Sequence, residues 1–244
     1  MIRAAGLDPA PVGRTNGRPR PRWSTQVLWA TRAALVTAIG ISLLFPDWEQ
    51  FQGKGMAYRA PFYLLPLVVV PVVWRRRGRP EPYPDLIDAL VIAPFLADTL
   101  GNVFGFYDTY AHTDDVLHFL NWVLLMGGVT LGLCRTYLRP LAAWAMGTGI
   151  GASAIIGWET AEWFVQKLGT TGLHLTYSDT IGDLVLSTTG GAIGAALAVW
   201  YSMLRYQLPA GPAGPAGTTE PDERAGSAPM VNPRNPTRGM NPTN

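Results

Sequence analysis

The chain has 244 residues, of which 48% are hydrophobic and only 15% are charged, with a formal net charge of +2. Soluble domains usually carry about a quarter charged residues, so this composition argues against a water-soluble protein and favours an integral membrane protein. The single cysteine, Cys134, excludes an intrachain disulfide and a zinc site built from several cysteines.

Both ends of the chain are polar and differ sharply from the apolar middle. Residues 1–26 hold five arginines among prolines and glycines, which predicts a disordered basic arm. An arm beside a membrane helix explains these arginines, and we expect no nucleic-acid partner. Residues 207–244 are rich in proline and glycine and predict a disordered tail. The membrane domain is therefore expected at 27–206.

Six apolar segments fill the middle of the chain, at 27–45, 58–74, 86–104, 116–134, 141–165 and 181–206. Each is of near-spanning length, except that the second is short and its prolines predict kinks. Asp85 is predicted to cap the third segment at its N-terminus. The sequence thus predicts an all-α, integral membrane bundle of about six transmembrane helices.

The arginines predict how these helices are oriented. Arginine-rich connections follow the second, fourth and sixth segments, whereas the other connections hold few basic residues. The positive-inside rule then places both the N- and the C-terminus in the cytoplasm. We expect a multi-pass protein of a bacterial plasma membrane, surrounded by membrane lipids, and the sequence identifies no protein partner.

Carboxylates and one histidine lie at the predicted outer ends of the last three segments. Their spacing of three or four residues places each pair on one helix face. The candidate metal ligands are Asp115, His118, Glu159, Glu162, Asp179 and Asp183. Because the topology puts all of them at one membrane face, we expect an acidic pocket there. Oxygen-rich ligands with one imidazole suit Mg, Mn, Ca or Zn, and no other cofactor is expected.

Simpler interpretations exist for each pair. Asp114 and Asp179 are placed to cap helices, and Glu159 and Glu162 lie between tryptophans typical of the headgroup region. Two like charges at this spacing nevertheless repel, which favours a bound cation or a protonated carboxyl group. Weaker candidates at the same face are Asp98, Asp108, His112 and His174.

Glycines recur at four-residue spacing in the last two segments, as Gly147 and Gly151 and as Gly190 and Gly194. Small residues at this spacing allow two membrane helices to approach closely. We therefore expect the fifth and sixth segments to pack together, which would bring their carboxylates near one another.

The order of these motifs resembles a known family. The matching residues are Asp115, His118 and Phe119, then Glu159, Glu162 and Trp163, then Asp179, Thr180 and Asp183. Over residues 85–205 this order resembles the YjdF-like family of bacterial inner-membrane proteins. It is more distantly similar to VanZ-like membrane proteins, which usually have glutamine at the position of Glu162 and asparagine at that of Ser187. The resemblance implies a polytopic bacterial inner-membrane protein and implies no particular reaction.

Three functions remain open. A divalent ion could polarise a phosphate or ester of an envelope lipid, with Glu159 and Glu162 as ligands or general base. The carboxylates could instead relay protons or cations in a transporter, or a cation could only join helices in a structural or assembly protein. An enzyme requires a cavity beside the carboxylates, and a transporter requires polar groups that continue to the inner face. The sequence shows no nucleophile motif and no outer-face arginine cluster, which counts against the enzyme.

Overall fold

The computed structural model describes residues 21–80, 82–136, 138–169 and 176–207, and all regular structure within them is helical. The helices are α1 (Arg22–Leu44), η1 (Glu49–Phe51), α2 (Met56–Leu64), α3 (Pro66–Arg76), α4 (Asp85–Val103), α5 (Phe106–Thr109), α6 (Thr113–Leu133), α7 (Pro140–Lys167) and α8 (Tyr177–Gln207). The predicted all-α class is confirmed. Most of the predicted arm 1–26, the tail beyond residue 207 and His174 lie outside the described residues.

Six spans are long and apolar enough to cross a membrane, which confirms the predicted number. One of them, Met56–Arg76, consists of α2 and α3 together. The two helices meet at Leu65, where Pro66 begins α3 because proline has no N–H to continue the hydrogen-bonding ladder. The predicted proline kink in this span therefore lies at its centre.

Several helices begin earlier than the apolar patterns predicted. α1 starts at Arg22, ahead of residue 27, and α6 and α8 start ahead of residues 116 and 181. Thr176, and not Asp179, caps α8, because its Oγ1 accepts a hydrogen bond from the Asp179 N–H at 3.2 Å. The predicted cap role of Asp85 is wrong: Asp85 is the first residue of α4, and its carboxylate accepts a hydrogen bond from Thr25 Oγ1 of α1 at 2.8 Å.

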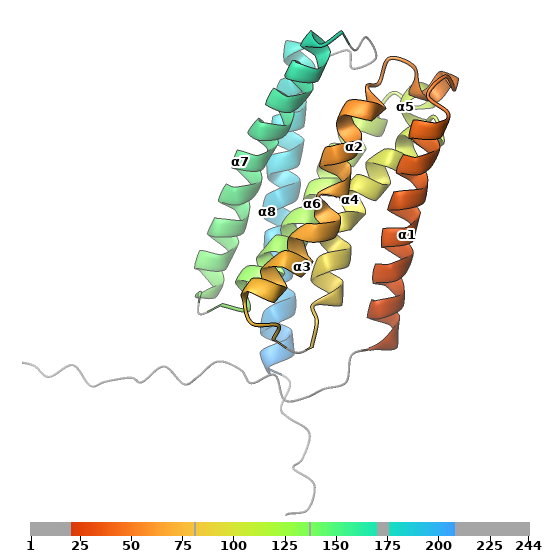
Figure 1. The fold of residues 1–244 in the computed structure, drawn as a ribbon. Helices are drawn as coiled ribbons and strands as arrows, with labels where there is room; N and C mark the ends of the chain where they lie inside the picture. Colours follow the sequence, from red (N-terminus) through yellow and green to blue (C-terminus); the bar gives the residue numbers. More distant parts are fainter. Residues whose placement is uncertain (1–20, 81, 137, 170–175, 208–244) are drawn as a thin grey trace, which may run out of the picture. The chain divides into compact units, whose positions relative to one another are not determined.

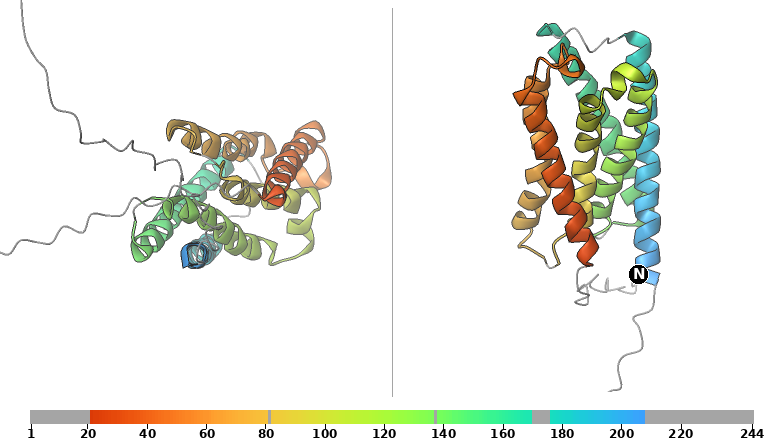
Figure 2. Two further views of the ribbon diagram at one scale, coloured as in Figure 1. Left: turned by 90° about the horizontal axis from the view of Figure 1, so that it is seen from below. Right: turned by 90° about the vertical axis from the view of Figure 1, so that its right-hand side faces the viewer.

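The helices of residues 21–207 pack as a connected bundle (Figure 1). α4 packs against α1 on one side and α6 on the other, and α6 packs most extensively against α8. α7 lies against α8 and α6, and the view along the helices shows α4 between its two neighbours (Figure 2). α2 completes the bundle near α7, where the rings of Tyr63 and Trp158 stack with centroids 6.0 Å apart.

The glycines of α7 and α8 allow close helix packing, as predicted. The two helices pack against each other, but the glycines also pack against α6, which the sequence did not predict. A Cβ added at Gly190 or Gly194 of α8 would overlap the backbone carbonyl oxygen of Phe119 or Val123, both on α6. On α7, Gly147 likewise faces Thr130 of α6. The small-residue faces of α7 and α8 therefore both pack against α6. This packing places the histidine of α6 close to both helices.

A second polar cluster joins α1 to α4 near the arginine-rich connections. Arg32 Nη2 lies 2.5 Å from Oδ2 of Asp88, whose side chain is fully buried. The hydroxyl of Tyr83 donates a hydrogen bond to the same oxygen at 2.5 Å. This ion pair is remote in the sequence from the carboxylates of α6, α7 and α8 and serves to hold α1 against the rest of the bundle.

Candidate functional site

A cavity of about 380 Å³ lies where α2, α4, α6 and α7 meet, at the end of the bundle that carries the predicted ligands. Its polar wall includes Arg59, Asp98, Asp114, His118 and Glu162. One turn or more further along the helices, its lining is mostly apolar, with Phe95, Trp122, Leu125 and Trp158 around a single amide, Asn121. The polar lining thus ends on large hydrophobic side chains, and the volume suffices for a lipid headgroup or another small molecule.

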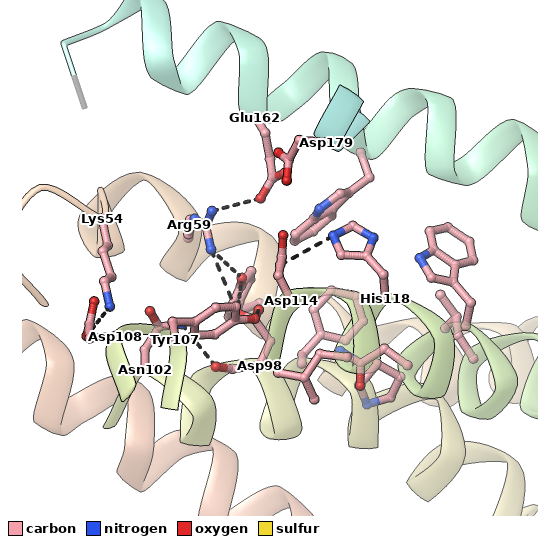
Figure 3. Close-up of a pocket in the computed structure, with 18 of the residues that line it drawn as sticks. Lys54, Arg59, Asp98, Asn102, Tyr107, Asp108, Asp114, His118, Glu162 and Asp179 are labelled. Atoms are coloured by element: carbon pink, nitrogen blue, oxygen red, sulfur yellow. Dashed lines mark hydrogen bonds and ion pairs between the residues drawn. The ribbon is translucent and has the colours of Figure 1, made fainter. Parts of the chain in front are cut away.

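Arg59 and Asp98 form the centre of the polar wall (Figure 3). Arg59 Nη2 donates a hydrogen bond to Glu162 Oε1 at 2.7 Å, and Nη1 lies 3.8 Å from Asp98 Oδ2. The hydroxyls of Tyr63 and Tyr107 donate to the two oxygens of Asp98, one each. One carboxylate therefore joins α2, α4 and α5, and Arg59 extends the network to α7.

Tyr107 reaches Asp98 because the chain turns sharply after α4. Gly105 has φ +65°, a left-handed conformation that favours glycine, and α5 starts immediately after it. Burial of the phenol and the neighbouring Asp98 carboxylate raise the pKa of Tyr107 well above its ordinary value. Tyr107 therefore keeps its proton and remains a hydrogen-bond donor throughout the physiological pH range.

This raised pKa predicts a loss of stability at high pH. Above about pH 10 an unfolded tyrosine loses its proton, whereas Tyr107 retains its proton in the fold. The unfolded state then binds fewer protons, so the free energy of unfolding falls as the pH rises. Tyr107→Phe should flatten this decline, measured as the unfolding midpoint in detergent between about pH 8 and 11. Tyr110→Phe, at an exposed position, is the control, and equal slopes in Tyr107→Phe and the wild type would contradict the prediction.

His118 lies where α6 faces α8. Its Nδ1 is 3.0 Å from Oγ of the fully buried Ser187, and its Nε2 is 3.7 Å from both Asp114 Oδ1 and Asp183 Oδ1. A hydrogen bond from Nδ1–H to Ser187 leaves the lone pair of Nε2 directed at the carboxylates. A partner of this kind on the second ring nitrogen is typical of metal-binding histidines.

Two groups of side chains near this histidine have potential metal ligands within 4.8 Å of one another. One is His118, Glu159 and Glu162, and the other is Asp114, His118 and Asp183. Metal–ligand distances are about 2.1 Å for Mg and about 2.4 Å for Ca, so two ligands of one ion can lie about 4–5 Å apart. Each group is therefore compact enough to close around an ion with small side-chain movements.

Glu159 is the least satisfied member of these groups. Its side chain lies on α7 with only 7% of the residue exposed, and both carboxylate oxygens lack a hydrogen-bond partner among the described residues. Burying an unpaired carboxylate is costly, and membrane proteins compensate such groups with protons, cations or partner side chains. The orphaned oxygens thus point to a ligand or a proton at this position.

The structure brings together most, but not all, of the predicted site residues. His118, Glu159, Glu162 and Asp183 belong to the two groups, while Asp179 lines the cavity outside both. Asp115 belongs to neither group: its side chain is 53% exposed, with Oδ2 lying 3.3 Å from Nδ1 of His112. Asp114, one residue earlier, takes the place predicted for Asp115 because it lies on the helix face toward His118.

Sequence reasoning missed the residues that α2 and α5 contribute. Arg59 and Tyr63 fall in the proline-rich span, and Tyr107 falls in a predicted loop. The one available signal was Arg59 itself, a basic residue at the start of an apolar segment and on the predicted outer face, where few others occur.

Comparison with known proteins bears on the family and not on the reaction. No curated protein and no solved structure matches the chain. The model of the family described as predicted membrane protein (DUF2238) matches residues 27–203. This range includes every residue of the two groups and all six spans, apart from the start of the first span and the end of the last. The chain therefore belongs to this family of membrane proteins, the YjdF-like family that its motifs resemble.

Proposed function

We propose that this protein holds a divalent cation with His118, Glu159 and Glu162 and uses it to hydrolyse a phosphate or carboxylic ester of an envelope lipid at the outer face of a bacterial plasma membrane. The observation that carries the proposal is Glu159. Both of its buried carboxylate oxygens are unpartnered among the described residues, and one of them lies within 4.8 Å of ligand atoms of His118 and Glu162. A cation such as Mg, Mn, Ca or Zn would compensate the charge of both glutamates and explain why they lie close together.

The cavity supports hydrolysis over the other functions. A cation in this position would acidify a bound water molecule and polarise the ester. Asp114, with 43% of its side chain exposed at the cavity wall, is the carboxylate best placed to accept the proton, in place of the base role predicted for Glu159 or Glu162. The water oxygen would then bond to phosphorus or to the carbonyl carbon, the bond to the alcohol oxygen would break, and Asp114 would return its proton to the departing alkoxide.

The apolar end of the cavity argues against a transporter. Beyond the polar wall the lining is mostly apolar, with Phe95, Trp122 and Leu125 beside Asn121, and the buried core around Ile92 and Ala89 follows on α4. A transport pathway would require polar groups to continue through this layer toward the opposite end, and the described lining offers only Asn121 there. A purely structural cation would not require a cavity beside its ligands.

Metal content tests the proposal. The full-length protein, purified in detergent and incubated separately with Mg, Mn, Ca and Zn, is desalted and measured by elemental mass spectrometry, with thermal melts before and after chelation. We expect about one equivalent of one metal in the wild type and a lower melting temperature after chelation. Loss of a second-sphere partner costs about 10–100-fold in affinity, so Glu159→Gln, which removes a direct ligand, should cost at least as much.

Asp115→Asn is the matched control, because it removes a nearby carboxylate that belongs to neither group. It should keep the metal. A wild type that retains none of the four metals and melts identically with chelator, or a Glu159→Gln variant that retains as much metal as Asp115→Asn, would overturn the proposal.

A further inference from the structure

A cation at Glu162 would also affect Arg59, which makes Glu162 the link between two parts of the cavity. Glu162 belongs to the group with His118 and Glu159, and its Oε1 accepts the hydrogen bond from Arg59 Nη2 at 2.7 Å. A carboxylate that binds a divalent cation shares its negative charge with the metal and attracts a guanidinium less. Cation binding should therefore weaken the pairing between Glu162 and Arg59.

When Glu162 binds a cation, Arg59 is placed to bind another anion. Its side chain is 11% exposed and lines the cavity, and Asp98 and Tyr63 hold it from the side away from Glu162. A guanidinium has five N–H donors in a planar fork, and within the described residues the hydrogen bonds to Tyr63 and Glu162 use two of them. This fork matches two oxygens of a phosphoryl group, which is the recognition that arginine performs best.

The charge of the cavity indicates that a bound cation would favour phosphate binding. Within the described part of the chain, the cavity is lined by the cationic side chains of Lys54 and Arg59 and by six carboxylates, Glu49, Asp98, Asp108, Asp114, Glu162 and Asp179. Lys54 is already occupied, because its Nζ lies 2.7 Å from Asp108 Oδ2. A phosphoryl group entering the cavity alone would meet an excess of negative charge, whereas a bound divalent cation would offset part of it.

We propose that Arg59 binds the phosphoryl group of the substrate and that the cation and the phosphoryl group bind cooperatively, through Glu162. This inference rests on the proposed function and narrows its substrate class from esters in general to phosphate esters. In the cation-free protein Arg59 is neutralised by Glu162, and in the cation-loaded protein it faces the substrate. Because coupling between two ligands is reciprocal, phosphate should tighten cation binding by the same factor.

Calorimetric titrations at pH 7 test this coupling in the full-length protein. Mn²⁺ is titrated with and without inorganic phosphate, and phosphate is titrated with and without saturating Mn²⁺. We expect saturating Mn²⁺ to raise phosphate affinity at least tenfold in the wild type. Arg59→Gln should still bind Mn²⁺, at least as tightly as the wild type, and should lose the coupling. Lys54→Gln, which removes the other cation of the cavity, should keep it.

Two further arms complete the design. Arg59→Lys retains a charge beside Asp98, so it serves where Arg59→Gln does not fold, and its single ammonium should reduce the coupling. In nanodiscs, phosphatidic acid replaces inorganic phosphate, with phosphatidylcholine as the reference lipid. Coupling with both phosphate compounds would identify the phosphoryl group itself as the ligand, and coupling with phosphatidic acid alone would identify a lipid headgroup.

The outcomes separate this inference from the proposed function. If the wild type binds no divalent metal, both fail together. If Mn²⁺ binds but neither phosphate compound binds more tightly in its presence, the inference is wrong while the cation site stands. Equal coupling in the wild type and Arg59→Gln would overturn the role of Arg59 in the same way.

Discussion

Replacing Asp98 with alanine should destabilise the protein by about 3–5 kcal/mol, the usual cost of removing one partner from a buried ion pair. Asp98 is the common acceptor for Tyr63 and Tyr107 and lies beside Arg59. Its loss leaves two hydroxyl groups without their acceptor and removes one of the two carboxylates that compensate the guanidinium. The free energy of unfolding, measured by denaturant titration in mixed micelles, checks the size of the effect.

Asp115 provides the control. It pairs with His112, and both side chains are exposed to solvent, 53% for Asp115 and 86% for His112. Pairs that remain in contact with water contribute about 0–1 kcal/mol, so Asp115→Ala should have little effect. Equal losses in the two variants would show that the network around Asp98 does not hold the helices together.

Gly194→Ala should be the most destabilising single-methyl substitution among the glycines of α7 and α8. The added Cβ would overlap the carbonyl group of Val123, and a backbone atom cannot move aside without shifting α6. Overpacking usually costs about 1–3 kcal/mol, and we expect the upper part of that range or more because the obstacle is backbone. For a domain of this size, a loss of about 3 kcal/mol lowers the melting temperature by about 6–12 °C.

Gly149→Ala separates this clash from the intrinsic effect of alanine. Gly149 lies on α7, and a Cβ there would meet nothing within 4 Å among the described residues. Alanine favours a helix over glycine by about 0.5–1 kcal/mol, so this control should be neutral or slightly stabilising. Gly194→Ala should therefore lower the melting temperature while Gly149→Ala leaves it unchanged or raises it slightly, and a similar decrease in both would contradict the tight contact between α6 and α8.

The sequence predicted the parts of this structure that depend on local pattern. Apolar length determines the spans, and helical spacing places His118, Glu159, Glu162 and Asp183 on faces that can meet. The choice between Asp114 and Asp115 could not be made, because it depends on where α6 begins. The helix starts at Thr113, ahead of the apolar run that was used to place it.

The polar network around Asp98 was beyond sequence reasoning for a different reason. It requires that Arg59, near the start of the span formed by α2 and α3, points into the bundle toward Glu162. It also requires that the left-handed conformation of Gly105 reverses the chain and places Tyr107 beside Asp98. Neither event leaves a periodic signal. The sequence also could not show which helix packs against the glycines of α8. By spacing alone, Gly190 and Gly194 could contact either α6 or α7.

The pair of Arg32 and Asp88 has a consequence for how the protein is made. The two residues lie 56 positions apart in the chain, so Arg32 is synthesised well before its partner. During that interval the guanidinium must extend to the headgroups, as long basic side chains near helix ends do. Full packing of α1 against α4 therefore follows the synthesis of Asp88, and it buries both charges in the same step.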